Sequence, residues 1–89
     1  MAAETTLAAL RRKANLTQLE MADVFEMSQA GISRWETLSR IPMEDLPRIH
    51  AYFVDVLGAD AMEGIDPLDL IRPWEKVVAR NARRARRAS

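Results

Sequence analysis

The sequence predicts an all-α fold of four to five helices, followed by an additional amphipathic C-terminal helix. Three observations favour this class. Apolar residues recur at spacings of three and four along most of the chain, typical helix-start residues precede these patterns, and no alternating strand pattern is present. With 89 residues, of which 48% are hydrophobic, the chain is sufficient for one small domain and too apolar for a disordered segment.

The first predicted helix covers residues 5–14, with Thr5 or Thr6 as its N-cap. Leu7 lies on its buried face. Asn15 is expected to end this helix, because Asn tolerates the left-handed backbone conformation needed there.

The second and third predicted helices, residues 18–25 and 29–37, are separated by only three residues. Thr17 and Glu20 form a capping box at the start of helix 18–25, and Ser28 is the N-cap candidate of helix 29–37. Two capped helices joined by so short a link must cross sharply, which is the helix-turn-helix arrangement. The side chains expected to face inward are those of Leu19, Ala22, Phe25, Ile32 and Trp35.

A fourth helix is predicted over residues 43–57. It ends at Gly58, a common residue after a helix C-terminus. Pro47 fits within the first turn, where its missing N–H costs little. The apolar stripe of this helix consists of Leu46, Ile49, Phe53 and Leu57.

Two further helical segments follow. Asp66 before Pro67 favours a short turn of helix over residues 67–71. A last helix is predicted from Pro73 to about Arg87, with one basic face and one apolar face. The apolar face comprises Trp74, Val77, Val78, Ala82 and Ala85.

The charge is distributed unevenly along the chain, although the formal net charge is zero. Residues 35–71 carry two basic residues against eight acids, a net of −6, and residues 72–89 carry seven basic residues against one acid, a net of +6. Binding depends on the local field, so a neutral chain is still able to bind nucleic acid. We divide the chain into a domain of residues 1–65, with the helix-turn-helix at 17–36, and a basic helical extension of residues 66–89.

The composition argues against several other classes of protein. The chain has no Cys and only His50 as a histidine, so it offers neither disulfides nor a clustered metal site. No nucleophile–base pair or phosphate-binding loop is present, and we predict no catalytic activity and no cofactor. No apolar run has the length of a membrane span, and the N-terminus lacks a basic signal-peptide start, so a cytoplasmic protein without membrane contact is expected.

The third helix mixes small and hydrogen-bonding residues, which suits insertion into the major groove of DNA. Gln pairs bidentately with adenine and Arg with guanine, so Gln29 and Arg34 are the strongest candidates for base contact. The alternative is a plain pair of packed helices with solvated polar residues, and it requires the caps, the short break and this residue set to coincide. The candidate base-contacting residues are Gln29, Ala30, Gly31, Ser33 and Arg34.

The stretch LRRKANLTQLEMADVFEMSQAGISRWE, with the helix after it, resembles the phage repressor/Cro family of helix-turn-helix regulators, also called the Xre family. The resemblance covers roughly residues 7–57 and implies a repressor-like DNA-binding domain. It also implies a structural pair between Arg11 and Glu36. Glu26 stands where the family usually has Gly, at a position that favours positive φ. The residues expected to contact phosphates are Thr17, Gln18, Ser28, Ser39 and Arg40.

The basic tail allows three interpretations. It is a solvated helix face packed onto the domain, an arm that neutralises DNA phosphates, or a docking element for a protein partner or a second protomer. The arm would use Arg80, Arg83, Arg84, Arg86 and Arg87.

These observations together predict a sequence-specific DNA-binding transcriptional regulator, a repressor that binds a palindromic operator in double-stranded DNA as a homodimer. Two alternatives remain open. One is a helix-turn-helix antitoxin that binds a toxin through its C-terminal helix and regulates its own operon. The other is a protein–protein adaptor that keeps the fold without binding DNA.

Overall fold

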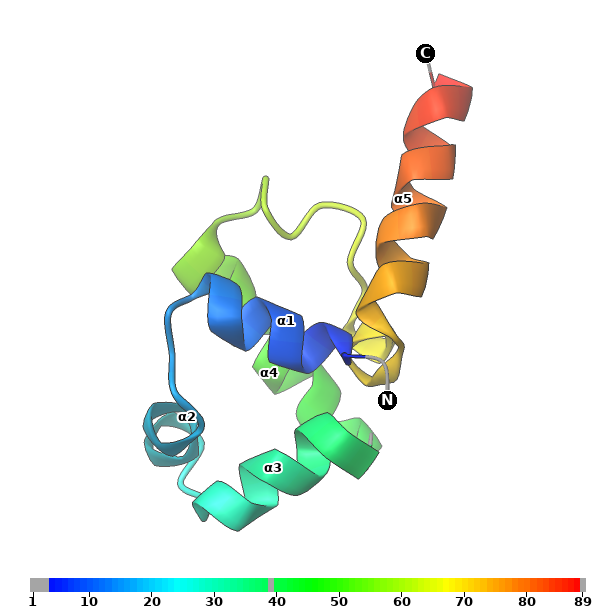
Figure 1. Ribbon diagram of the computed structural model, residues 1–89. Coiled ribbons are helices and arrows are strands. Elements are labelled where there is room, and N and C mark those ends of the chain that lie inside the picture. The colour runs from blue at the N-terminus through cyan, green and yellow to red at the C-terminus, as the bar shows by residue number, and fades with distance from the viewer. Residues whose placement is uncertain (1–3, 39, 89) are drawn as a thin grey trace.

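The computed structural model describes residues 4–38 and 40–88, and in these ranges the chain forms five α-helices and two short 3₁₀ helices. Helices α2 and α3 lie at one end of the molecule, α1 and α4 occupy the middle, and α5 extends away from the rest (Figure 1). The prediction of an all-α fold is confirmed. The elements in chain order are α1 (Thr6–Lys13), α2 (Gln18–Val24), α3 (Gln29–Leu38), η1 (Met43–Asp45), α4 (Leu46–Leu57), η2 (Pro67–Ile71) and α5 (Trp74–Ala88).

The start of α2 and the turn after it have the local chemistry that the sequence predicts. The Thr17 hydroxyl accepts from the Glu20 amide at 3.1 Å, and the Glu20 carboxylate accepts from the Thr17 amide at 3.0 Å, which completes the capping box. The φ angles of Asn15 (59°) and Glu26 (54°) are both positive. Both residues therefore take the left-handed conformation that their positions indicate.

One continuous hydrophobic core joins the helices, and it includes residues from the C-terminal segment. Its fully buried side chains come from α1, α2, α3, α4, η2 and α5. Trp35 is also buried, as expected of a core anchor. The most deeply buried apolar residues are Leu7, Leu10, Met21, Ile32, Ile49, Phe53, Leu70 and Val77.

The inward face of α2 differs from the prediction. Leu19 was expected to face the core, but it is 64% exposed, whereas Met21 is fully buried. Each helical residue turns the chain by about 100°, so positions 19 and 21 point in nearly opposite directions. Met21, Ala22 and Phe25 share the face that meets the core, and this leaves Leu19 in solvent.

The predicted fourth helix is divided in two. Residues 43–45 form the tighter 3₁₀ helix η1, and α4 begins only at Leu46. Pro47 explains the boundary, because a residue without an N–H belongs in the first turn of an α-helix. Gly58 follows the end of α4 with a φ of 94°, as the sequence predicts.

Main-chain hydrogen bonds join the segment at the start of α1 to the segment between η2 and α5. The Thr6 amide donates to the Arg72 carbonyl at 2.9 Å, and the Trp74 amide donates to the Glu4 carbonyl at 2.8 Å. Leu70 and Val77 also belong to the core. Residues 66–77 therefore share the core of the preceding helices, and the part of the tail that stands apart begins only after Arg80, which still bonds to Asp69 and Gly64.

The predicted apolar face of α5 is only partly used. Trp74 is half-buried and Val77 is buried, but Val78 is 45% exposed, and Ala82 and Ala85 are exposed too. The interpretation in which Trp74, Val77 and Val78 pack the helix onto the domain therefore fails at Val78, and Ala82 and Ala85 do not reach the core. The reason is the direction of α5, which stays in contact with the domain as far as Arg80 and then projects away from it (Figure 1). None of the helices described here is both long and apolar enough to cross a membrane.

Candidate nucleic-acid interface

The outward face of α3 carries most of the residues predicted to contact bases. Gln29, Ala30 and Arg34 are exposed, and Gly31 and Ser33 are partly covered. Residues four apart lie one above the other on a helix. Gln29 therefore aligns with Ser33, and Ala30 with Arg34, in two adjacent rows.

Gly31 permits a close contact within this region. A Cβ at this position would lie 2.9 Å from the methyl carbon of Met27, so the missing side chain lets Met27 lie against α3. Met27 and Gly31 line a hollow of about 480 Å³ that also reaches Arg34 and Arg40. The cationic side chains predicted for base contact and for phosphate contact thus border the same hollow.

Glu36 fixes α3 to the two helices before it. Its carboxylate accepts from Arg11 Nε at 2.5 Å, from Arg11 Nη2 at 3.2 Å and from Gln18 Nε2 at 3.0 Å. Arg11 also donates to the Leu16 carbonyl at 2.8 Å. The predicted Arg11–Glu36 pair is present, and it holds α1, α2 and α3 together from a site that is nearly closed to solvent.

The predicted phosphate contacts have different surroundings. Gln18 is half-buried, and its side chain supports Glu36, a role that the sequence did not indicate. Thr17 and Ser28 are exposed N-cap residues whose hydroxyl oxygens accept main-chain N–H groups and whose hydroxyl protons remain free to be donated. Arg40 is exposed, and Ser39 lies outside the described residues.

The Phe25 side chain packs between the turn that joins α2 to α3 and the side chains of α4. The Phe25 ring packs against Trp35 and Tyr52, with centroids 6.1 and 5.3 Å apart. The Arg48 guanidinium lies 5.3 Å from the centroid of the same ring. These contacts connect the turn to α4, so the position of α3 is set by packing as well as by the Glu36 hydrogen bonds.

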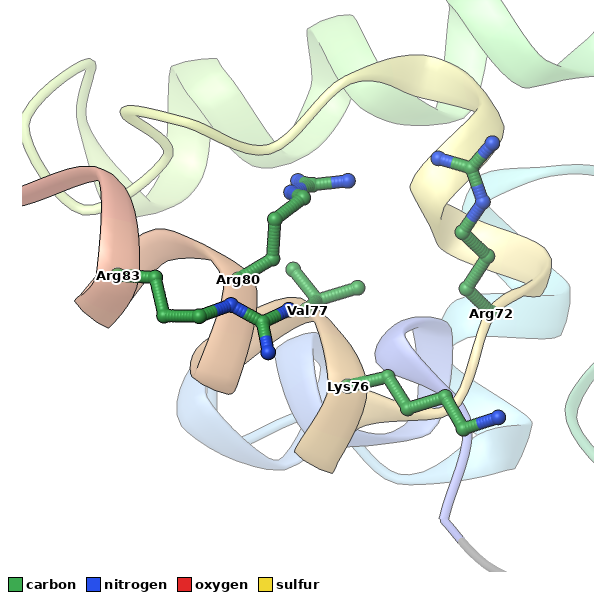
Figure 2. Close-up of a pocket in the computed structure, with 5 residues that line it drawn as sticks. All are labelled: Arg72, Lys76, Val77, Arg80 and Arg83. Carbon is green, nitrogen blue, oxygen red and sulfur yellow. The ribbon is translucent and has the colours of Figure 1, made fainter.

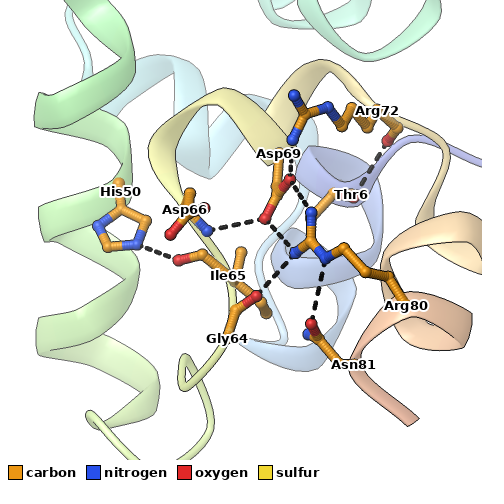
Figure 3. A network of polar contacts seen from close by, with 9 residues as sticks. All are labelled: Thr6, His50, Gly64, Ile65, Asp66, Asp69, Arg72, Arg80 and Asn81. Carbon is orange, nitrogen blue, oxygen red and sulfur yellow. Dashed lines mark hydrogen bonds and ion pairs between the residues drawn. The ribbon is translucent and has the colours of Figure 1, made fainter. Parts of the chain in front are cut away.

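A second buried carboxylate, Asp69, organises the base of the tail (Figure 3). Arg80 donates to its two oxygens at 2.8 and 2.6 Å, Arg72 donates to Oδ1, and the Asp66 amide donates to Oδ2 at 2.8 Å. Arg80 also donates to the Gly64 carbonyl at 2.8 Å. The hydrogen bonds from Arg80 are the main reason why the pKa of Asp69 lies well below its usual range, against the opposing effect of burial.

The loop before η2 is held to α4 as well as to α5. Its Ile65 carbonyl lies 2.6 Å from His50 Nε2 (Figure 3). His50 therefore has the structural role expected of a lone histidine.

The expectation that Arg80 belongs to a phosphate-binding arm needs correction. Its guanidinium is committed to Asp69 and Gly64, and only 22% of its side chain is exposed. The spacing of three residues between Asp69 and Arg72 indicates that these two side chains can pair. Nothing in the sequence indicates that Arg80, which lies on another helix, joins them. The other predicted arm residues, Arg83, Arg84, Arg86 and Arg87, are exposed on α5.

The direction of α5 separates these arginines from α3. The C-terminal end of α5 lies at the opposite end of the molecule from α3 (Figure 1). The outward face of α3 points away from the core, whereas α5 leaves on the other side of it. The base-facing residues and the arginine-rich end therefore belong to two separate surfaces. Within residues 4–38 and 40–88, no group of three or more His, Asp and Glu residues is placed to hold a metal ion.

A helix-turn-helix family model matches residues 7–53, more than half of the chain. The chain belongs to this family, which is the phage repressor/Cro (Xre) type that the sequence resembles. It is a DNA-binding helix-turn-helix regulator, of a family that consists of regulators and not of enzymes. No curated protein and no solved structure matches the chain.

Proposed function

We propose that the chain is a sequence-specific transcriptional repressor that reads bases in the major groove with α3. The observation that carries this proposal is the double row of Gln29, Ala30, Ser33 and Arg34, exposed except for the partly covered Ser33, on a helix that Glu36 fixes in place. In this proposal Gln29 pairs with adenine and Arg34 with guanine, and each such pair contributes about 1–3 kcal/mol of discrimination against the wrong base. A fixed helix is important because base contacts depend on accurate placement.

Affinity in this proposal comes from contacts to the DNA backbone around α3. Arg40 borders the same hollow as Arg34, and Thr17 and Ser28 lie at the N-termini of α2 and α3, where free main-chain N–H groups and helix dipoles favour phosphates. Gln18 is placed at the same end of α2, so its contribution would combine support of Glu36 with contact to the backbone.

We further propose that two copies bind one operator. One recognition helix covers only half of a typical site, and proteins of this motif bind two half-sites about 34 Å, or one helical turn, apart. A twofold dimer would therefore recognise a palindrome and would repress by occluding a promoter.

Selection of binding sites from random duplex DNA tests this function. We expect an enriched inverted repeat, and a complex with two protein chains per duplex by analytical ultracentrifugation. The absence of any enriched sequence, with only weak binding at low salt, would contradict sequence-specific reading. An enriched single half-site with one chain bound would leave the reading intact and contradict the dimer.

A further inference from the structure

The basic residues of α5 form a row, which we call the basic track. Its helical members are spaced by four, three and four residues, so they lie on one side of α5 and extend along about 16 Å of its axis. Arg72 precedes the helix at the lower end of the row. The basic track consists of Arg72, Lys76, Arg80, Arg83 and Arg87.

The lower end of the basic track borders a hollow of about 380 Å³ with no acidic residue in its lining (Figure 2). The lining residues are Arg72, Lys76, Val77, Arg80 and Arg83. Asp69 lies beneath this surface and is fully buried, so it orients Arg72 and Arg80 without presenting a carboxylate to solvent. In the described part of the chain, neither Lys76 nor Arg83 has an acidic partner. The hollow therefore concentrates positive charge that is only partly neutralised.

The basic track has a rigid lower part and an open upper part. Arg80 connects α5 to η2 and to the Gly64 carbonyl, and Val77 is in the core. Beyond these anchors, α5 projects from the domain with Arg83 and Arg87 exposed (Figure 1). The anchors fix the direction of the projecting part, so its charges are presented in a defined line.

The occupant that fits this row is the phosphate backbone of duplex DNA. The backbone presents closely spaced negative charges without an apolar surface, and the Arg side chain forms paired hydrogen bonds to phosphate. A typical protein partner would instead need apolar residues at the centre of the contact. On α5 these residues, Val78, Ala82 and Ala85, lie on the side opposite the basic track.

We propose that Lys76, Arg83 and Arg87 of the basic track bind the backbone of a second DNA duplex, independently of sequence, while α3 holds the first, and that Arg72 and Arg80 orient the track through Asp69. The outward face of α3 and the projecting end of α5 lie at opposite ends of the molecule, so one straight duplex seated on α3 does not extend along the projecting end of α5 (Figure 1). The chain would then connect two DNA segments. This role goes beyond the proposed function, because it does not require α3 to recognise a sequence.

A capture experiment with the full-length chain tests the second site. A tethered duplex that contains the selected site is saturated with protein, and a labelled duplex of unrelated sequence is then added. We expect capture by the wild type and a strong reduction for the double variant Arg83→Gln/Arg87→Gln. The slope of log affinity against log salt for the second duplex should decrease by about 0.9 for each phosphate interaction that the substitutions remove. Binding of the double variant to the tethered duplex should stay at the wild-type level.

Arg84→Gln compared with Arg83→Gln is the matched control, because both remove one arginine charge from neighbouring positions of α5. Arg84 borders a different hollow, together with Asp60 and Glu63, and lies off the basic track. We expect Arg83→Gln to reduce capture more than Arg84→Gln does. Equal losses of capture would mean that the second duplex responds to the total charge of α5 and not to the position of the arginine on the basic track. That result overturns the proposal.

Two further outcomes also decide the proposal. Absence of capture by the wild type overturns it, and so does binding of polyglutamate with the same dependence on Arg83, because the occupant would then be an acidic protein surface. The variant Gln29→Ala/Arg34→Ala separates this result from the proposed function. If it loses sequence preference and still binds unrelated duplex through Arg83, both surfaces act as proposed. If it loses all DNA binding, α3 carries the whole affinity and the basic track is not a DNA site.

Discussion

Two buried carboxylates, Glu36 and Asp69, perform the same task in different parts of the molecule. Each accepts hydrogen bonds from arginine and fixes a helix: Glu36 fixes α3 through Arg11, and Asp69 fixes α5 through Arg80. They differ in exposure, because Asp69 is fully buried and Glu36 is 8% exposed. They also differ in their partners, since Glu36 has one arginine and one glutamine whereas Asp69 has two arginines and a main-chain amide. The comparison indicates that loss of Asp69 should be the more damaging.

The largest effect is expected for Asp69→Ala. The substitution removes the acceptor that joins η2 to α5 and should lower the free energy of unfolding by about 3 kcal/mol, at the lower limit for breaking a buried ion pair because Arg72 and Arg80 can still reach water. Urea denaturation measures the change. Asp60→Ala, which removes an exposed acid in the loop before η2, is the control and should change stability by no more than about 0.5 kcal/mol. Equal effects of the two substitutions would show that Asp69 does not hold α5.

Arg11→Ala tests the other carboxylate and should have a smaller effect, a loss of about 2 kcal/mol, because Gln18 still donates to Glu36. Arg12→Ala is the adjacent control. The Arg12 side chain is 63% exposed and pairs with Glu4 in solvent, so its loss should cost less than about 1 kcal/mol. Urea denaturation of the two variants gives both values. A loss for Arg12→Ala as large as that for Arg11→Ala would contradict the role of Glu36 as the support of α3.

The acid dependence of stability gives a separate test of the Asp69 site. The folded-state pKa of Asp69 is lower than its unfolded-state value, so the unfolded chain binds the proton more readily. The stabilisation is therefore complete above the ordinary carboxyl pKa of about 3.9 and is lost as the pH falls below it. Asp69→Asn should reduce the acid dependence by roughly 1 kcal/mol per pH unit between pH 4 and 3, as measured by urea denaturation across this range. An unchanged acid dependence in this variant would argue that Asp69 is not held as the anion.

The smallest effect is expected at the turn before α3. Glu26 has a φ of 54°, which is costly for a residue with a side chain, so Glu26→Gly should stabilise the fold by about 0.5–1 kcal/mol. Asn15→Gly, at a φ of 59°, should give a smaller gain because Asn tolerates this conformation. Thermal denaturation of both variants makes the comparison. A larger gain at Asn15 would contradict the assignment of strain to Glu26.

Local features of the fold could be predicted from the sequence because their causes lie within a few residues. The capping box of Thr17 and Glu20 and the left-handed conformation of Asn15 are of this kind, whereas the left-handed conformation of Glu26 was expected from the family resemblance. The prediction that Leu19 faces the core was wrong, because a seven-residue helix offers too few positions to decide which of two apolar faces is buried.

Contacts between distant segments could not be predicted from single-chain patterns. Arg80 appeared as a free cation of a basic helix, and its partner Asp69 appeared as one of eight acids in the acidic segment of residues 35–71. The main-chain hydrogen bond between Thr6 and Arg72 depends on neither side chain, so no residue type indicates it. The Arg11–Glu36 pair is equally distant in sequence, and it could be expected only from the resemblance to a family.

The central claim is that α3 reads base sequence, and a comparison of Arg34→Ala with Arg40→Ala in site selection tests it most directly. Both arginines border the same hollow and carry the same charge. We predict that Arg34→Ala relaxes preference at one base position of each half-site, with a loss of about 1–3 kcal/mol on the preferred sequence. Arg40→Ala should keep the preference, weaken binding to all sequences alike and reduce the salt slope by about 0.9 for each phosphate that is no longer neutralised. If both variants keep the wild-type preference and lose affinity equally, Arg34 contacts only the backbone and the claim is contradicted.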